Sequence, residues 1–207
     1  REIFAARYRR RTIVMTALLT VAIIGLWAGA VYEPTAVAQL ARKAGMDAAA
    51  SARMVSVATG VLSVGTIAGC IVLPWIAERA GRKPALAIYF AGMAVTIPAA
   101  FGWAFYREGA LAGFVGVLFV LGFFGGNFTA FSLWLPELYD TRVRATAFAF
   151  ATSFGRFVGA GVNFVIGSAV LRMGTLGTPV AWTAAAFVAG LAIIPFAVET
   201  RGQALPE

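Results

Sequence analysis

Long stretches without a charged residue alternate with short polar segments along the whole chain. Five stretches carry no charge, and a sixth is interrupted only by Arg156. The five are residues 12–32, 54–77, 84–106, 109–136 and 173–198, and the sixth is 145–171. Each is longer than the ~18 residues that indicate a membrane-crossing helix. The pattern therefore predicts six transmembrane helices, over about 12–40, 53–77, 84–106, 110–135, 145–171 and 179–198.

Helices suit these stretches better than strands do. A backbone exposed to lipid must satisfy its own hydrogen bonds, which only helices and closed barrels achieve. Barrel strands are segments of ~10 residues that alternate in polarity, and these stretches do not alternate. The predicted fold class is an all-α polytopic membrane protein. It has a basic segment at 1–11, a transmembrane region at 12–198 and a tail at 199–207.

The longest connection lies between the first two predicted helices. We expect Pro34 to kink a helix that continues to about Leu40, and residues 42–50 to form an external loop with Gly45 and Asp47 in its turn. Elsewhere, small residues recur at spacings that let membrane helices approach closely. These residues are Gly60, Gly65, Gly69, Gly122, Gly126, Gly155 and Gly159.

The basic residues are distributed unequally between the two sides that these helices define. Eleven would lie on the side of the termini: Arg1, Arg7, Arg9, Arg10, Arg11, Arg79, Arg82, Lys83, Arg142, Arg144 and Arg201. Five would lie on the other: Arg42, Lys43, Arg53, Arg107 and Arg172. Because cytoplasmic loops carry the excess of Lys and Arg, we expect both termini in the cytoplasm.

Composition supports this class and narrows the chemistry. Of 207 residues 60% are hydrophobic, against about 45–50% in soluble domains. The net charge of +8 alone would suggest nucleic acid, but the side on which the cations lie explains it as an orientation signal. There is no His, and the single cysteine, Cys70, lies inside a predicted helix. We expect no metal, no cofactor, no intrachain disulfide and no nucleic-acid partner.

Two predicted cytoplasmic loops and the tail each combine a glutamate with an arginine. One loop reads Glu78-Arg79-Ala80-Gly81-Arg82-Lys83, the next reads Glu137-Leu138-Tyr139-Asp140-Thr141-Arg142-Val143-Arg144, and the tail reads Glu199-Thr200-Arg201-Gly202. An ordinary positive-inside loop would explain the cations. It would not explain the ordered acid–Arg–x–Gly–Arg–Lys pattern, in which Gly81 permits a tight turn.

With these three runs the chain resembles the C-terminal six-helix half of a major facilitator superfamily transporter, in the branch of sugar porters and metabolite–proton symporters. The first run matches the signature between helices eight and nine, the second matches the Glu-x6-Arg element between helices ten and eleven, and the third matches the closing Pro-Glu-Thr-Lys-Gly element. The resemblance covers essentially the whole chain. It implies half of a twelve-helix fold, built from two inverted three-helix repeats.

The chain departs from the family pattern at Pro74, where a Gly is usual, and at Asp140 and Val198, where Pro is usual. These departures weaken the assignment to the sugar porters proper and leave the assignment to the superfamily intact. In the family, the loop residues form cytoplasmic ion pairs that hold the outward-facing state closed. By resemblance, the gating ion pairs are assigned to Glu78, Arg79, Arg82, Glu137, Arg144 and Glu199.

Polar residues inside predicted helices are candidates for the transport path, because they are costly in lipid. Arg156 lies roughly 15 Å into its helix, near the membrane midplane. Its partner is an anionic substrate, a carboxylate of a missing half or backbone carbonyls. Asn163 lies seven residues on, near the same helix face, and Asn127 lies among aromatic residues that suit a small polar solute.

The first predicted helix holds a third group, Trp27, Tyr32, Glu33 and Pro34. Trp27 and Tyr32 are candidates for substrate binding, since the family often has an aromatic residue before a proline here, in a helix that bends during gating. We expect the proton-coupling carboxylate in the missing half, and Glu33 is the one candidate for it within this chain. It would titrate if it faced the cavity, and otherwise it is an exposed carboxylate at the outer interface.

These observations favour secondary active transport of a small polar or anionic solute by alternating access, with proton symport. The expected partners are the solute, the proton, membrane lipid and a missing N-terminal six-helix half, in a bacterial inner membrane. Residues 1–11 lack a signal-peptide pattern, so we expect a fragment that starts in a cytoplasmic loop. One alternative is a channel-like or structural subunit, but the sequence has no sign of the re-entrant loop that a channel filter needs. The other is an intramembrane enzyme, but the predicted helices contain no His or Asp for its active site.

Overall fold

The computed structural model describes residues 2–203 and 206, apart from the side chains of residues 26 and 28–30. All regular structure in this part of the chain is helical. The main helices are α1 (Arg9–Lys43), α2 (Ala48–Ala80), α3 (Arg82–Ile97), α4 (Ala110–Gly125), α5 (Thr129–Leu138), α6 (Thr141–Met173), α7 (Gly177–Ala181) and α8 (Ala184–Ile193). The short ones are η1 (Glu2–Phe4), η2 (Pro98–Trp103), η3 (Ala104–Tyr106), η4 (Gly126–Phe128) and η5 (Ile194–Phe196).

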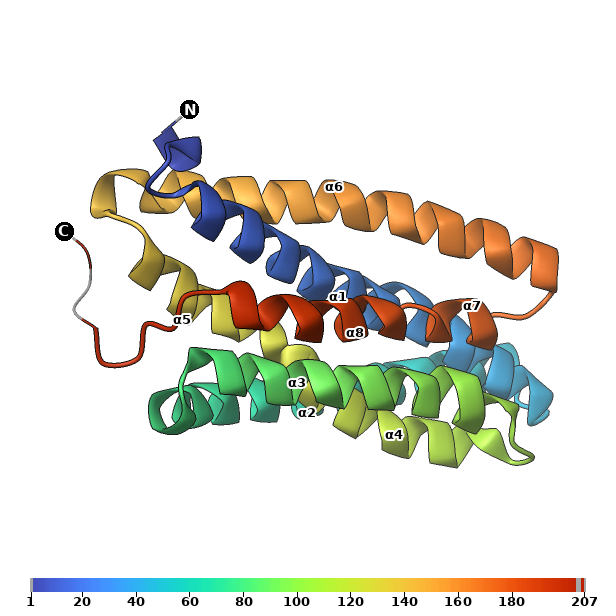
Figure 1. Ribbon diagram of the computed structural model, residues 1–207. Helices are drawn as coiled ribbons and strands as arrows, with labels where there is room; N and C mark the ends of the chain where they lie inside the picture. Colours follow the sequence, from blue (N-terminus) through green and yellow to red (C-terminus); the bar gives the residue numbers. More distant parts are fainter. Residues whose placement is uncertain (1, 204–205, 207) are drawn as a thin grey trace.

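The helices lie side by side as a bundle with two distinct ends (Figure 1). We call the end that holds both termini, the α2–α3 turn and the α5–α6 connection the terminal end. The opposite end holds the α1–α2, η3–α4 and α6–α7 connections. The two termini therefore share one end, as the sequence predicts. The predicted tail, 199–207, is described only as far as residue 203 and at residue 206, and residue 1 of the basic segment lies outside the described residues.

Five helical stretches of the fully described chain are long and apolar enough to cross a membrane: Ala48–Ala80, Arg82–Tyr106, Ala110–Leu138, Thr141–Met173 and Gly177–Phe196. These five correspond to the second to sixth predicted spans. α1 has 35 residues, which is long enough to cross a membrane. It includes residues 26 and 28–30, whose side chains are not described, so it is not among these five. Its role as a sixth span, and the inverted repeats, stay predictions.

The connection between α1 and α2 is shorter than we expected. α1 continues through Pro34 to Lys43, and α2 already begins at Ala48, so the predicted loop 42–50 shrinks to residues 44–47. The reason is local. Gly45 takes a φ of 78°, and the Asp47 side chain accepts a 2.7 Å hydrogen bond from the Ala50 backbone N–H, which caps α2 within this short turn.

Glycines bring α2 and α4 into backbone contact. A Cβ added at Gly69 would overlap the carbonyl oxygen of Phe123, and one added at Gly122 would overlap that of Leu62. Gly65 approaches the Phe119 carbonyl as closely, and Gly126 of η4 approaches the Cys70 backbone less closely. On α6, Gly155 and Gly159 pack against the Ile23 side chain of α1. Gly60 faces open space, so the prediction that it packs against another helix is wrong.

Candidate functional site

The densest group of polar contacts lies at the terminal end, around the Arg82 side chain. Arg82 begins α3 and donates hydrogen bonds of 2.6 and 3.1 Å to the two carboxylate oxygens of Glu137 in the last turn of α5. It also contacts Glu78 at 2.8 Å and the Ala77 carbonyl at 3.0 Å. Because this side chain is only 9% exposed, the two-pronged pairing with Glu137 is shielded from water.

Glu199 joins this group from the C-terminal segment. Its carboxylate binds backbone N–H groups instead of side-chain cations. Its carboxylate accepts hydrogen bonds from the backbone N–H groups of Arg82 (2.9 Å) and Lys83 (3.0 Å). A carboxylate is favoured there because the N-terminus of a helix offers free N–H groups and a positive dipole end. Gly81 makes the approach feasible, with a φ of 107° and no Cβ, which would lie 2.8 Å from Glu199 Oε2.

These backbone hydrogen bonds set the charge state of Glu199. Burial raises the pKa of its carboxyl, and the N–H groups of residues 82, 83, 200 and 201 lower it further than burial raises it. The pKa of Glu199 therefore lies below its ordinary value, and the carboxylate is charged at neutral pH. The Thr200 hydroxyl extends the group by donating to Glu137.

Two of the predicted gating residues have other partners. Arg79 lies outside the group, with its guanidinium 3.8 Å from the centre of the Trp75 ring. Arg144 does not pair with Glu137, since it donates to the carbonyls of Tyr139 (3.3 Å) and Pro206 (3.1 Å). Glu137 and Arg144, both assigned to gating ion pairs within the Glu-x6-Arg element, therefore do not pair with each other in the described residues. Their spacing in the sequence puts them near each other, but Arg82 reaches Glu137 from the α2–α3 turn.

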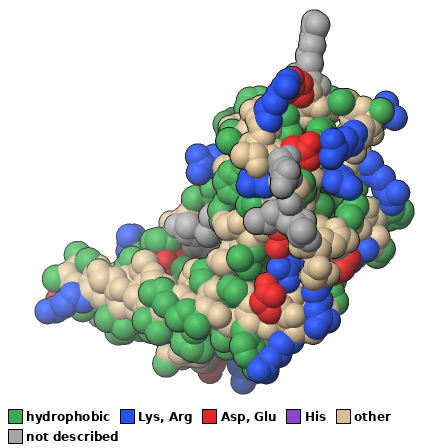
Figure 2. Space-filling model, turned by 90° about the vertical axis from the view of Figure 1, so that its left-hand side faces the viewer, with side chains coloured by type: hydrophobic (Ala, Val, Ile, Leu, Met, Phe, Trp, Pro, Cys, Tyr) green, Lys and Arg blue, Asp and Glu red, His purple; other side chains and the backbone are tan. Residues whose placement is uncertain are grey.

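The segment before α1 folds against the α5–α6 connection. Asp140 accepts hydrogen bonds from the hydroxyl of Tyr8 and from the Arg7 guanidinium, the latter at 3.1 Å. The sequence marks this residue only as a departure from the family pattern. Arg11 donates to the Leu138 carbonyl at 3.0 Å. The bond to Asp140 and partial burial raise the pKa of Tyr8. Figure 2 shows basic side chains gathered over this end of the molecule, with acidic ones among them.

The candidates for the transport path fall into two groups. Trp27 and Tyr32 of α1 meet α6, where the Tyr32 hydroxyl donates to the Asn163 backbone carbonyl at 3.0 Å and Trp27 lies beside Gly159. Arg156 is also on α6, is exposed, and has no ion-pair partner among the described residues. The structure thus brings Trp27, Tyr32 and Asn163 together and leaves Arg156 on the same helix with a free guanidinium.

Asn127 lies apart from that group, at a break in the fourth membrane stretch. The 3₁₀ turn η4 interrupts the helix between α4 and α5 and packs on α2 near Cys70. The Asn127 side chain is buried, its amide N–H donates to the Phe124 carbonyl at 2.9 Å, and its Oδ1 has no partner within the described part of the chain. A mid-helix 3₁₀ turn with an unsatisfied polar atom is typical of a functional position.

Glu33 is buried, so the alternative of an exposed interfacial carboxylate is wrong. Its side chain is 1% exposed. One carboxylate oxygen accepts a 3.1 Å hydrogen bond from the Thr59 hydroxyl of α2, and the other, Oε1, is buried without a partner among the described groups. Sequence reasoning missed Thr59 because nothing in the run around it distinguishes it from a lipid-facing threonine.

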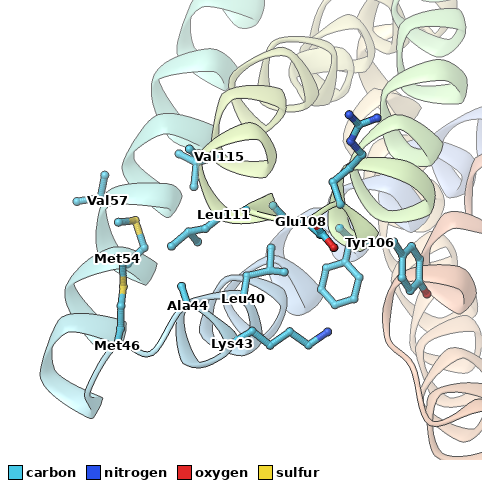
Figure 3. A pocket seen from close by; sticks show the side chains of 15 residues that line it. Leu40, Lys43, Ala44, Met46, Met54, Val57, Tyr106, Glu108, Leu111 and Val115 are labelled. Carbon is cyan, nitrogen blue, oxygen red and sulfur yellow. The ribbon is translucent and has the colours of Figure 1, made fainter.

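A cavity of about 860 Å³ lies at the opposite end, between the end of α1 and the starts of α2 and α4 (Figure 3). Its wall is mostly apolar, with Leu40, Met54 and Leu111 around it and the charged Lys43 and Glu108 among them. None of the predicted substrate-binding residues lines it. Among the described residues, no group of three or more His, Cys, Asp and Glu side chains is arranged to hold a metal ion.

The sequence matches that of known transporters. The profile of the family described as "Sugar (and other) transporter" matches residues 2–207. The chain is 31% identical to a gallate transporter of Pseudomonas putida, covering 94% of this chain and 41% of the relative. It is also 31% identical to plastidic glucose transporter 4 of Arabidopsis thaliana, covering all of this chain and 37% of the relative. The chain thus spans about two fifths of the length of these relatives.

The fold is similar to solved transporter structures at lower identity. A D-xylose–proton symporter superposes with a TM-score of 0.71 and 17% identity, over 91% of this chain and 48% of that one. The xylose transporter XylE from E. coli, in an inward-open conformation, superposes with a TM-score of 0.73 and 18% identity over the same shares. The helical arrangement is therefore that of half such a transporter.

Proposed function

The chain belongs to the sugar (and other) transporter family of multi-pass membrane proteins, and on that premise we propose that it forms the C-terminal half of a secondary active transporter. The transporter moves a small polar or anionic solute by alternating access, in symport with protons. The proposal rests on one observation above all: Arg82 joins the α2–α3 turn, the end of α5 and the C-terminal segment within a single polar group.

Alternating access needs contacts that differ between two states of similar free energy. In the proposed mechanism, the group around Arg82, which includes Glu78, holds the helix ends of this half together. The guanidinium of Arg79 is exposed, and that of Arg144 is bound only to backbone carbonyls in the described residues. Both are therefore available to carboxylates outside this chain. The excess of Lys and Arg at the terminal end supports a cytoplasmic position for both termini.

The solute would bind where α1 and α6 face the missing half. Trp27 and Tyr32 offer aromatic surface there, and Asn163 and Arg156 offer polar groups on α6. Since Arg binds carboxylates with two parallel hydrogen bonds, the exposed Arg156 favours a carboxylate-bearing solute over a neutral sugar. Asn127, with its unpartnered Oδ1, would contribute from the η4 turn.

Uptake into proteoliposomes that contain the full-length protein tests this function. We would measure labelled glucose, glucuronate and gallate with an imposed pH gradient. Arg156→Ala should reduce uptake of the acidic solute at least tenfold while membrane insertion stays normal. Arg172→Ala, which removes an exposed arginine from the last turn of the same helix, is the matched control and should leave uptake unchanged. Wild-type kinetics in Arg156→Ala would refute the substrate role of Arg156.

A further inference from the structure

Glu33 and Thr59 form a polar pair between α1 and α2, with Glu33 buried and Thr59 at the exposed edge of the contact. The Thr59 hydroxyl lies 3.1 Å from Glu33 Oε2, and Glu33 Oε1 is buried with no partner in the described part of the chain. Near the pair, Ala36 and Val37 of α1 and Ala58 of α2 are fully buried. The Glu33 carboxyl group is therefore buried, with the hydroxyl of the exposed Thr59 as its one hydrogen-bonding neighbour among the described residues.

No cation of the described residues forms an ion pair with this carboxyl. α8 carries no charged residue. On α1 and the other helices packed around it, the charged residues nearest to the pair in sequence are Arg42 and Lys43 on α1 and Arg53 on α2, six to ten residues away. Farther from the pair in sequence lie Arg11, Glu78, Glu108, Glu137 and Arg156, with Tyr32 and Cys70 as further titratable groups.

An ionised carboxylate in such a place is costly, because a buried charge needs a partner and full hydrogen bonding. Binding one proton from water converts the carboxylate to a neutral acid. The Thr59 hydroxyl can donate to the carboxylate, and it can donate to or accept from the neutral acid. We propose that Glu33 and Thr59 are the site at which this half binds the coupling proton, with Glu33 as the acceptor and Thr59 as its positioning residue. This inference rests on the proposed transport function.

The position of the pair in α1 connects proton binding to conformation. Pro34 follows Glu33 directly and lacks the backbone N–H that would complete the helix there. α1 is therefore weakest beside the carboxyl, and bending at that point would carry Glu33 away from Thr59 toward water. The neutral acid favours the packed arrangement of α1 and α2 described above, and the carboxylate favours the bent one. Proton binding and helix bending are thereby linked.

The test separates proton coupling from transport itself. In proteoliposomes with the full-length protein, Glu33→Gln should lower pH-gradient-driven accumulation of gallate or glucuronate at least tenfold. Counterflow of the same solute, which needs no net proton movement, should stay within about twofold of wild type. Glu108→Gln, which neutralises an exposed carboxylate at the opposite end, is the matched control and should change neither. Absence of counterflow in the wild type would refute the transport function, whereas undiminished accumulation in Glu33→Gln would refute only the proton site.

A spectroscopic measurement does not depend on the solute. The infrared difference spectrum of the full-length protein between acid and alkaline pH should contain a carboxylic-acid C=O band that Glu33→Gln removes. Thr59→Val should shift the pH midpoint of that band upward, because it removes the hydrogen bond to the carboxylate, and Thr59→Ser should restore it. A band that persists unchanged in Glu33→Gln, or a midpoint that Thr59→Val leaves in place, would overturn the proposal.

Discussion

Arg82 and Glu137 are joined by two hydrogen bonds of 2.6 and 3.1 Å, although 55 residues separate them in the chain. Each belongs to a different connection at the terminal end, so this pair fixes the α2–α3 turn against the end of α5. Both side chains are largely shielded from solvent, at 9% and 17% exposure.

Glu137→Gln should destabilise the protein, because it leaves the Arg82 guanidinium with a neutral partner in a shielded place. A hydrogen bond to a charged group contributes about 2 kcal/mol, which should appear as a lower melting temperature in detergent. Arg79→Ala is the control, since Arg79 contacts only the Trp75 ring among the described residues. Equal melting temperatures for Glu137→Gln and wild type would show that the pair does not support this half.

Glu199 predicts a pH dependence of stability. Since the folded protein holds the pKa of Glu199 below its ordinary value of 4.5, the unfolded chain binds the proton more tightly. The contribution of this carboxylate is therefore complete above the ordinary value and is lost as the pH falls through the lower, folded value. The difference in melting temperature between wild type and Glu199→Gln should be largest at pH 7 and should shrink steadily in acid. A difference that does not change with pH would contradict this.

Gly69→Ala should disrupt the packing of α2 against α4, because its Cβ would overlap the Phe123 backbone carbonyl, which cannot move independently of its helix. We expect a strongly lowered melting temperature and poor recovery from membranes. Gly60→Ala is a matched control on the same helix, where a Cβ meets open space. It should be neutral or stabilising by up to about 1 kcal/mol, as alanine is the better helix former.

Tyr8→Phe should loosen the segment before α1. It removes the hydroxyl that donates to Asp140 while keeping the ring that packs near Tyr139. The loss of about 1 kcal/mol corresponds to roughly fivefold faster amide hydrogen exchange in residues 2–8. Arg10→Ala, at an exposed position, should leave exchange in this segment unchanged. Identical exchange in Tyr8→Phe and wild type would mean that Asp140 does not hold the segment.

Much of the fold could be predicted from the charge-free stretches alone. Each stretch is apolar over the length of a membrane helix, and the turns between them carry Gly45, Asp47 or Gly81. The extents of the helices were harder to predict, because helical backbone continues beyond the apolar residues. α1 thus includes Arg10 and Arg11 in its first turn and extends past Leu40 to Lys43.

The partners within the candidate site could be predicted less well. The spacing of Glu137 and Arg144 suggested a pair, but which of several nearby arginines a carboxylate meets depends on how the turns pack. Burial of Glu33 could not be read from its neighbours, since a single helix does not reveal which face meets another helix. Thr59 became visible only once α2 was placed against α1.

The glycine contact between α2 and α4 has a mechanical consequence. Two helices whose backbones touch at successive turns cannot slide or rotate past each other without breaking many contacts at once. We therefore expect α2 and α4 to move as one rigid body. At Glu33 and Pro34, α1 makes no glycine-mediated backbone contact with its neighbours, so it is the more compliant helix. Bending of this half is therefore expected in α1 beside Pro34 rather than between α2 and α4.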